Sequence, residues 1–162
     1  MDFGPALLFL AEHAPLLASL AVHGLDLPAA PLLRLAEGCP SLSRLHLVGC
    51  TYPEDGLDAF LGAANALTHL NLRDTDDLPG AQLQEWIENR LVAGGKPVRY
   101  LGLIHCHFER DGYSMGITAK VLHGWVEKAV REGRWSREQV PKIEFDSQVC
   151  SSVLFDNLVV EE

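Results

Sequence analysis

Apolar residues recur in four short segments of the chain with the spacing L-x-x-L-x-L. The anchor residues of these segments are Leu20, Leu45, Leu70 and Leu101, so the first two intervals are equal and the third is longer. The alternation within each segment predicts a short strand that turns one face toward the core. A weaker fifth copy, anchored at Ile143, follows after a still longer interval. Such repeats predict a stack of similar units, in which each unit buries its apolar face against the next.

Helical patterns separate the predicted strands. They cover residues 5–13, 31–37, 56–63, 80–93 and 117–132, with the apolar residues on one stripe in the longer segments. Trp86 lies on such a stripe and is expected in the core. Gly and Pro residues at the junctions indicate where the elements end. The sequence therefore predicts an α/β solenoid of alternating strands and helices, with the parallel sheet on the concave side and the helices on the convex side.

The chain is expected to turn inward three residues beyond the second apolar anchor of each unit. Cys50, Thr75 and Cys106 occupy this position in three units, and Leu25 occupies it in the first. The pattern resembles the consensus LxxLxLxx(N/C)xL of leucine-rich repeats, in which an Asn at this position bonds to the backbone. The resemblance implies that the small side chains fill the same buried slot. A reactive thiol would need an electropositive and accessible setting, so we expect these cysteines to be structural.

The repeats are most similar to the ribonuclease-inhibitor-like and cysteine-containing types, the latter common in F-box proteins. Cys39-Pro40 ahead of the second strand is part of this similarity. The resemblance is close over residues 4–108 and weak over 109–162. It implies a single leucine-rich repeat domain over residues 1–162, a short horseshoe of four to five strand–helix units. Regular repeats would extend to residue 108, followed by an irregular repeat and a C-terminal cap.

The first predicted helix is apolar nearly all round. It contains Leu7, Leu8, Phe9 and Leu10, and no polar cap precedes it. The terminal units of a solenoid need polar outer faces to remain soluble. We therefore expect this helix to be covered by a partner, by a missing module or by self-association.

Polar residues between and beside the leucines are expected to line the concave face. Strands lie about 4.8 Å apart, so equivalent residues of adjacent units come within contact. The predicted protein-binding surface consists of Arg44, His46, His69, Asn71, Arg73 and Tyr100. This surface is basic on an acidic chain and suits an acidic or phosphorylated segment. The alternative is a solvated sheet face without a partner.

A predicted loop over residues 109–116 carries Tyr113 and Met115 near its tip. Irregular loops on one face of a solenoid often contribute to binding, so these two residues are candidates for a further contact. The alternative is an ordinary surface insertion.

Composition limits the classes of partner. The chain has 162 residues and a net charge of −9, and its 13 Lys and Arg residues are scattered. Nucleic acid and anionic membranes are therefore not expected as partners. The apolar N-terminal stretch lacks a basic start and is broken by Glu12, His13 and Pro15, so it predicts neither a signal peptide nor a membrane span. We expect a cytoplasmic or nuclear protein with reduced cysteines.

The sequence offers little for catalysis or metal binding. His105 and His107 flank Cys106, but no third ligand with the spacing of a zinc site accompanies them, so we expect no metal and no cofactor. No GxSxG segment occurs. His46 and His69 would lie on an open surface, which excludes little water. We therefore do not expect an enzyme.

These observations predict a non-catalytic protein–protein interaction module. The resemblance to F-box/leucine-rich repeat proteins implies recognition of substrates for a ubiquitin ligase through the concave face. An F-box is not seen ahead of the first predicted strand, so an adaptor-binding module would lie elsewhere or would have been lost. The alternatives are a ribonuclease-inhibitor-like binder that blocks its partner, or a truncated repeat remnant, both without a ligase role.

Overall fold

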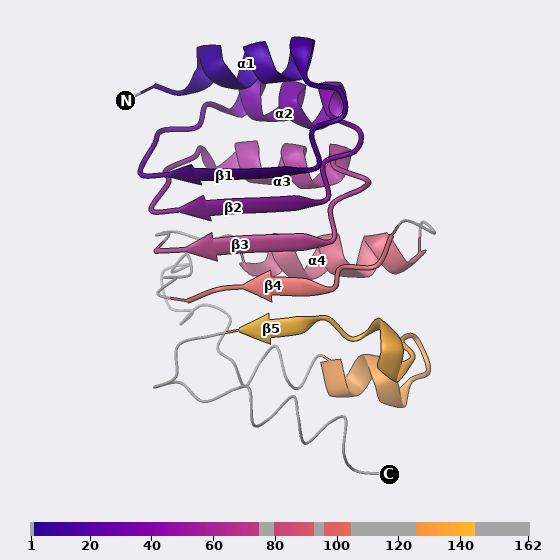
Figure 1. Ribbon diagram of the computed structural model, residues 1–162. Helices are drawn as coiled ribbons and strands as arrows, with labels where there is room; N and C mark the ends of the chain where they lie inside the picture. Colours follow the sequence, from indigo (N-terminus) through magenta and orange to yellow (C-terminus); the bar gives the residue numbers. More distant parts are fainter. Residues whose placement is uncertain (1, 75–79, 93–95, 105–125, 145–162) are drawn as a thin grey trace.

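The repeated strand segments pair into one parallel sheet in the computed structural model of the chain (Figure 1). The structure describes residues 2–74, 80–92, 96–104 and 126–144. Its sheet has five strands that lie side by side in chain order: β1 Ser19–His23, β2 Arg44–Val48, β3 His69–Arg73, β4 Tyr100–Gly102 and β5 Lys142–Glu144. The predicted α/β class with a parallel sheet is confirmed.

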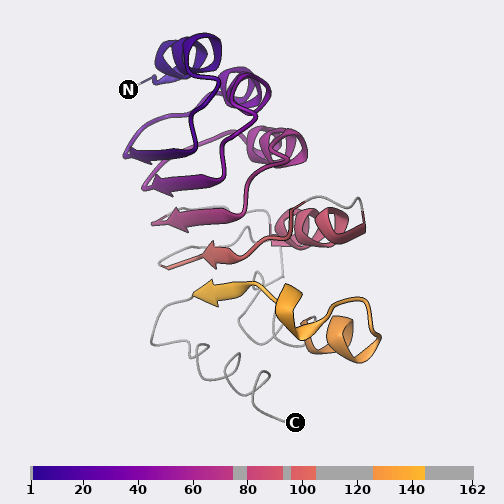
Figure 2. The same cartoon turned by 45° about the vertical axis from the view of Figure 1, so that its right-hand side comes forward.

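The helices lie along one side of this sheet, as two views of the molecule show (Figures 1 and 2). Their bounds are α1 Gly4–His13, α2 Ala29–Gly38, α3 Glu54–Ala63 and α4 Gly80–Val92, followed by the 3-10 helix η1 Arg137–Gln139. The first four agree with the predicted helices to within two residues at each end. Of the helix predicted over 117–132, residues 126–131 are helical and 117–125 lie outside the described residues.

Equivalent residues of the repeats pair directly across the sheet. Leu20 is paired with Leu45, Leu45 with Leu70, Leu70 with Leu101, and Leu101 with Ile143. The alignment of the repeats in the sequence therefore predicted the strand register correctly. It includes the weak fifth copy, which forms β5.

The first three units have the same backbone conformation at equivalent positions. The residue directly after each strand has a positive φ: Gly24 at 63°, Gly49 at 59° and Asp74 at 52°. This left-handed conformation suits glycine, and Asp is one of the few other residues that adopt it readily. It turns the chain away from the end of each strand.

The ends of the helices follow the same spacing. Pro28 and Pro53 occupy the N-cap positions of α2 and α3, with fixed φ values of −63° and −62°. At the other end, the backbone N–H groups of Ala14, Cys39 and Ala64 each donate to a carbonyl four residues earlier, closing α1, α2 and α3. The constant period of the first units thus specifies both ends of the helices as well as the strands.

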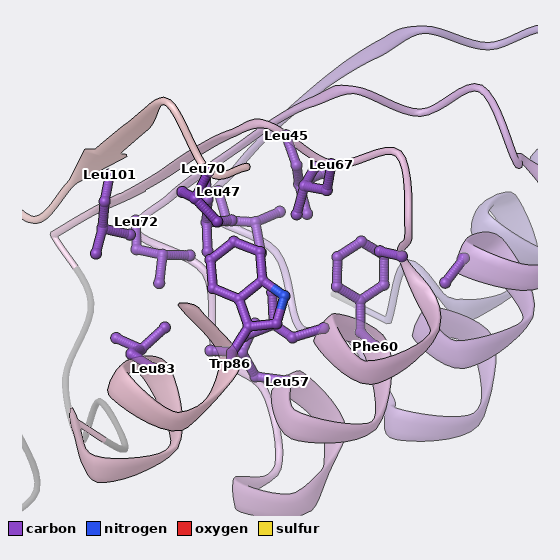
Figure 3. Close-up of a cluster of buried hydrophobic side chains, with 14 of the residues drawn as sticks. Leu45, Leu47, Leu57, Phe60, Leu67, Leu70, Leu72, Leu83, Trp86 and Leu101 are labelled. Atoms are coloured by element: carbon purple, nitrogen blue, oxygen red, sulfur yellow. The ribbon is translucent and has the colours of Figure 1, made fainter. Parts of the chain in front are cut away.

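The core lies between the sheet and the helices (Figure 3). Leu45, Leu70 and Leu101 from the strands have exposed fractions of 0%, 0% and 1%, and they share one buried cluster with Phe60 of α3 and Trp86 of α4. Full burial of a side chain of this size stabilises the fold by about 1.5 to 3 kcal/mol. The predicted core position of Trp86 is confirmed.

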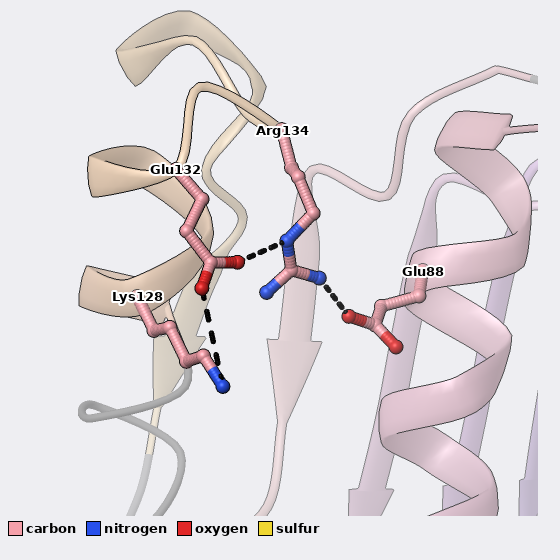
Figure 4. A network of polar contacts seen from close by, with 4 residues as sticks. All are labelled: Glu88, Lys128, Glu132 and Arg134. Atoms are coloured by element: carbon pink, nitrogen blue, oxygen red, sulfur yellow. Dashed lines mark hydrogen bonds and ion pairs between the residues drawn. The ribbon is translucent and has the colours of Figure 1, made fainter.

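Charged side chains connect the last units (Figure 4). Arg134 donates to Glu88 of α4 and, through Nε, to Glu132 Oε2 at 2.8 Å. Lys128 lies 3.9 Å from the other oxygen of Glu132. Trp135, next to Arg134, is buried at 4% exposure. One ion pair, between Arg134 and Glu88, therefore joins the segment 126–144 to α4, and Glu132 holds Arg134 and Lys128 together within that segment.

The first unit is less completely covered than the units that follow. Leu20 is only partly buried, whereas its equivalent Leu45 has no exposed surface. Phe9 on α1 is 62% exposed, and Leu16 in the turn before β1 is 85% exposed. The prediction that α1 carries apolar side chains beyond its buried face is confirmed.

None of the helices in the described segments is both long enough and apolar enough to cross a membrane.

Candidate functional site

The face of the sheet opposite the helices carries two rows of polar residues. Burial alternates along β2 and β3, with the leucines buried and the residues between them partly exposed or exposed. The strand register aligns these residues into one row of Arg44, His69, Tyr100 and Lys142, and a second of His46, Asn71, Gly102 and Glu144. Arg73 lies two residues after Asn71 on β3 and is paired with Val48 of β2. The structure therefore brings together all six residues of the predicted surface.

His69 occupies the cationic part of this face. Its ring is stacked on that of Tyr100, with centroids 6.2 Å apart. Partial burial lowers the pKa of His69, and the positive charges of Arg44, Arg99 and then His46 lower it further. Arg44 and Arg99 are exposed, and no carboxylate within the described part of the chain offsets their effect on His69.

Arg99 was not among the predicted site residues. It lies one residue before β4, and its backbone N–H donates to the Thr68 carbonyl at 2.8 Å. Residues at this strand entrance fall outside the L-x-x-L-x-L segment proper, so the alternation of strand faces did not indicate it. The signal was the position itself, which is equivalent to Ser43 and Thr68 in the preceding units.

We assign the neutral tautomer of His69 from the hydrogen bonds of Thr68. The Thr68 hydroxyl donates to the Ser43 carbonyl at 3.2 Å, which uses its single proton. The 2.9 Å contact between Thr68 Oγ1 and His69 Nδ1 is then a bond donated by Nδ1–H. Neutral His69 therefore carries its lone pair on Nε2, which is the ring nitrogen left for a ligand.

His46 and Asn71 form a second pair in the middle of the face. The Asn71 amide Nδ2 lies 3.3 Å from His46 Nδ1, and the amide N–H is the donor. Next to them, a Cβ at Gly102 would overlap Asn71 Oδ1 and lie 2.8 Å from the Tyr100 hydroxyl. Glycine at this position is what allows the Asn71 and Tyr100 side chains to lie side by side.

The part of the face over β4 and β5 is close to neutral. Tyr100 donates its hydroxyl to Glu144 Oε2 at 2.8 Å, and Lys142 Nζ lies 2.7 Å from Glu144 Oε1. Lys142 and Tyr100 lower the pKa of Glu144, while burial and Glu144 raise the pKa of Tyr100 to about 12. Arg73 acts on both groups as a nearby positive charge. The expected basic character is therefore strongest around His69, and Glu144 offsets it farther along.

Arg90 is a second charged residue that the sequence patterns did not reveal. It comes from α4, is 5% exposed and donates to the carbonyls of Ala64, Asn65, Leu67 and Lys96. Its guanidinium lies 5.5 Å from the centroid of the Trp86 ring. Arg90 follows Trp86 by four residues on the apolar stripe, and this helical spacing was the signal that it points inward. The four carbonyls lie in the loops that precede β3 and β4, so its role is structural.

The two described cysteines have structural positions. Cys50 Sγ donates to the Val22 carbonyl at 3.5 Å, and Cys39 Sγ donates to the Ala14 carbonyl at 3.3 Å. Both are free thiols and buried, and burial raises the pKa of Cys39. A thiol whose pKa is raised is a poor nucleophile at neutral pH. The expectation that Cys50 fills a buried slot against the backbone is confirmed.

Several candidate residues lie outside the described residues: His105, Cys106 and His107, and Tyr113 and Met115 of the predicted contact loop. Among the residues that the structure does describe, no three His, Cys, Asp or Glu side chains are grouped as metal ligands.

Comparison with known proteins gives no relative: no family model, no curated protein and no solved structure matches the chain. The class is therefore defined by the architecture, an α/β protein with repeated strand units in one parallel sheet.

Proposed function

We propose that the chain is a leucine-rich repeat solenoid that binds another protein through the polar face of its sheet. The observation that carries this proposal is the alignment of Arg44, His46, His69 and Asn71 on adjacent strands above a row of fully buried leucines. A rigid scaffold that presents Arg and aromatic residues on an open face suits recognition of a partner. His46 and Asn71 are positioned by their mutual hydrogen bond and His69 by its bond to Thr68, while the Arg44 side chain is exposed beside them.

The proposed role is non-catalytic. His46 and His69 are held by Asn71 and Thr68, which are neutral groups that orient an imidazole without increasing its basicity as a carboxylate would. The open face of a sheet does little to exclude water from a reacting group. The arrangement therefore favours binding over acid–base chemistry.

The partner that the repeat pattern favours is a ubiquitin-ligase substrate, as in F-box/leucine-rich repeat proteins. Cys39 and Cys50 support this kinship, since each is buried and bonds to the backbone of the preceding unit. A binder of the ribonuclease-inhibitor type is the second candidate. It is favoured by the same buried cysteines and differs in having no ligase bound alongside.

Affinity capture from cell lysate with quantitative mass spectrometry tests the proposal. The baits are the full chain, Arg44→Glu, and Arg34→Glu as a matched control, because Arg34 is equally a surface arginine but belongs to α2. We expect at least one protein to be lost with Arg44→Glu and retained with Arg34→Glu. Cullin-ligase components with all three baits support the ligase role, and their absence favours the inhibitor-like binder. Capture that is identical with all three baits contradicts the proposed surface.

A further inference from the structure

We propose that Arg44, His69 and Arg99 form a binding site for the phosphate group of a phosphorylated serine or threonine in a partner protein. The inference rests on the proposed function and specifies the ligand of the same face.

The strand register places Arg44 beside His69, and Arg99 directly precedes Tyr100, the β4 partner of His69. Arg44 on β2 is the direct neighbour of His69 on β3. Arg99 enters β4 beside Thr68, to which its backbone N–H donates. Both arginines are exposed, and both are close enough to His69 to lower the pKa of its ring. Two long guanidinium side chains thus flank an imidazole on adjacent strands.

This cluster has a surplus of positive charge. The groups that act on His69 are Arg44 and His46 from β2 and Arg99 from the entrance to β4, all basic. Tyr100 also faces it from β4, and its hydroxyl is engaged with Glu144. Glu144 itself lies two strands away on β5 and is paired with Lys142. Among the described residues, no acidic side chain acts on His69, so a bound anion would neutralise the positive charge of this cluster.

A phosphate monoester matches this charge better than a carboxylate. It carries a charge of about −1.5 to −2 at neutral pH and has three acceptor oxygens. Each guanidinium can donate two parallel hydrogen bonds to such an oxyanion. The net charge of −9 on the whole chain opposes a long polyanion such as nucleic acid. A single phosphorylated side chain can bind through the local positive charge around His69 alone.

Binding requires proton uptake by His69. Its Nδ1–H is committed to Thr68 Oγ1, so the neutral ring would direct the Nε2 lone pair at the anion. When Nε2 takes a proton, the ring becomes a cation and donates a further hydrogen bond to the phosphate. The phosphate raises the proton affinity of the ring, and the two binding events stabilise each other.

The test uses the full chain and an arrayed library of short peptides with a central phosphothreonine and varied flanks. Each peptide is paired with its unphosphorylated and glutamate-substituted forms. We expect selected phosphopeptides to bind at least about tenfold more tightly than either paired form. Arg44→Gln and Arg99→Gln should each weaken phosphopeptide binding by about tenfold, the scale of one charge-assisted hydrogen bond. Arg34→Gln on α2 should leave binding unchanged, and circular dichroism checks that each variant is folded.

The pH dependence isolates His69. Above pH 7 the phosphate is a dianion, so a fall in affinity between pH 7.0 and 8.5 reports the proton taken up by the protein. We expect this fall in the full chain, and a flat profile with His69→Gln. A flat profile in both proteins contradicts the role assigned to His69.

Other outcomes separate the two proposals. Peptides that bind equally with and without phosphate, through Arg44, overturn the phosphate site and leave the protein-binding face standing. Arg44-dependent binding to vesicles that contain a phosphoinositide, with no phosphopeptide selected, overturns it in favour of a lipid. Absence of phosphopeptide selection and of any partner lost with Arg44→Glu contradicts both.

Discussion

The units that contain β1, β2 and β3 keep a constant period, whereas those that add β4 and β5 follow at successively longer intervals. In the regular region, leucines, prolines and left-handed turns recur at equivalent positions. In the longer units, Arg90 and Arg134 bridge elements that the period no longer aligns. The comparison indicates that a repeat can vary in length if contacts of polar side chains replace the helix caps and left-handed turns of the regular units.

The largest expected effects come from the core, which both regions share. Leu45→Ala and Leu101→Ala should each lower the free energy of unfolding by about 3 to 4 kcal/mol, because both side chains are fully buried and a cavity remains. Urea unfolding measures both. A much smaller effect at Leu101 would contradict a continuous core across the two regions.

Arg90 should matter nearly as much as a core leucine. Arg90→Ala removes the donor from four carbonyls and should cost about 3 kcal/mol in the same assay. Arg34→Ala is the matched control, because Arg34 pairs with exposed Glu37 on the surface of α2, and it should change stability by less than about 0.5 kcal/mol. Equal effects at the two sites would show that Arg90 does not hold the longer unit together.

Two glycines sharpen the account of the regular region. Neither Gly49 nor Gly62 has an atom within 4 Å of the position of a Cβ, so the substitutions differ only in backbone conformation. Gly49→Ala should destabilise by about 1 to 2 kcal/mol because φ is positive. Gly62→Ala, inside α3, should stabilise by about 0.5 to 1 kcal/mol. Thermal unfolding should shift in opposite directions, and a shared direction would contradict the assigned turn.

The smallest effect concerns the link between β4 and β5. The pKa of Tyr100 is raised to about 12 from the ordinary value of 10.0, so the neutral phenol is favoured in the folded state. Its contribution is complete below pH 10 and is lost as the pH rises toward 12. Tyr100→Phe should lose about 1 kcal/mol at neutral pH, where the bond to Glu144 is intact. The difference between the two proteins should shrink above pH 10, and a constant difference would contradict the link.

The sequence predicted those features that depend on local alternation. The L-x-L pattern placed Arg44, His69 and Tyr100 in one row because strand register follows from the buried leucines. It did not predict that Glu144 would accept a hydrogen bond from the Tyr100 hydroxyl, since the two residues are 44 positions apart across an irregular interval. The burial of Arg90 was not predicted for a different reason. The spacing from Trp86 indicates that Arg90 points inward, but its partners are carbonyls in two loops, and no pattern within α4 indicates where those loops lie.

The strict pairing of equivalent residues also limits how the chain can change in length. Removing residues 44–68, one whole period, would bring His69 to the place of Arg44 and leave each leucine opposite a leucine. A deletion one residue longer or shorter would move the leucines of every later strand to the polar face. Length variation in the regular region is therefore confined to whole units, and each unit gained or lost adds or removes one residue from each row of the polar face.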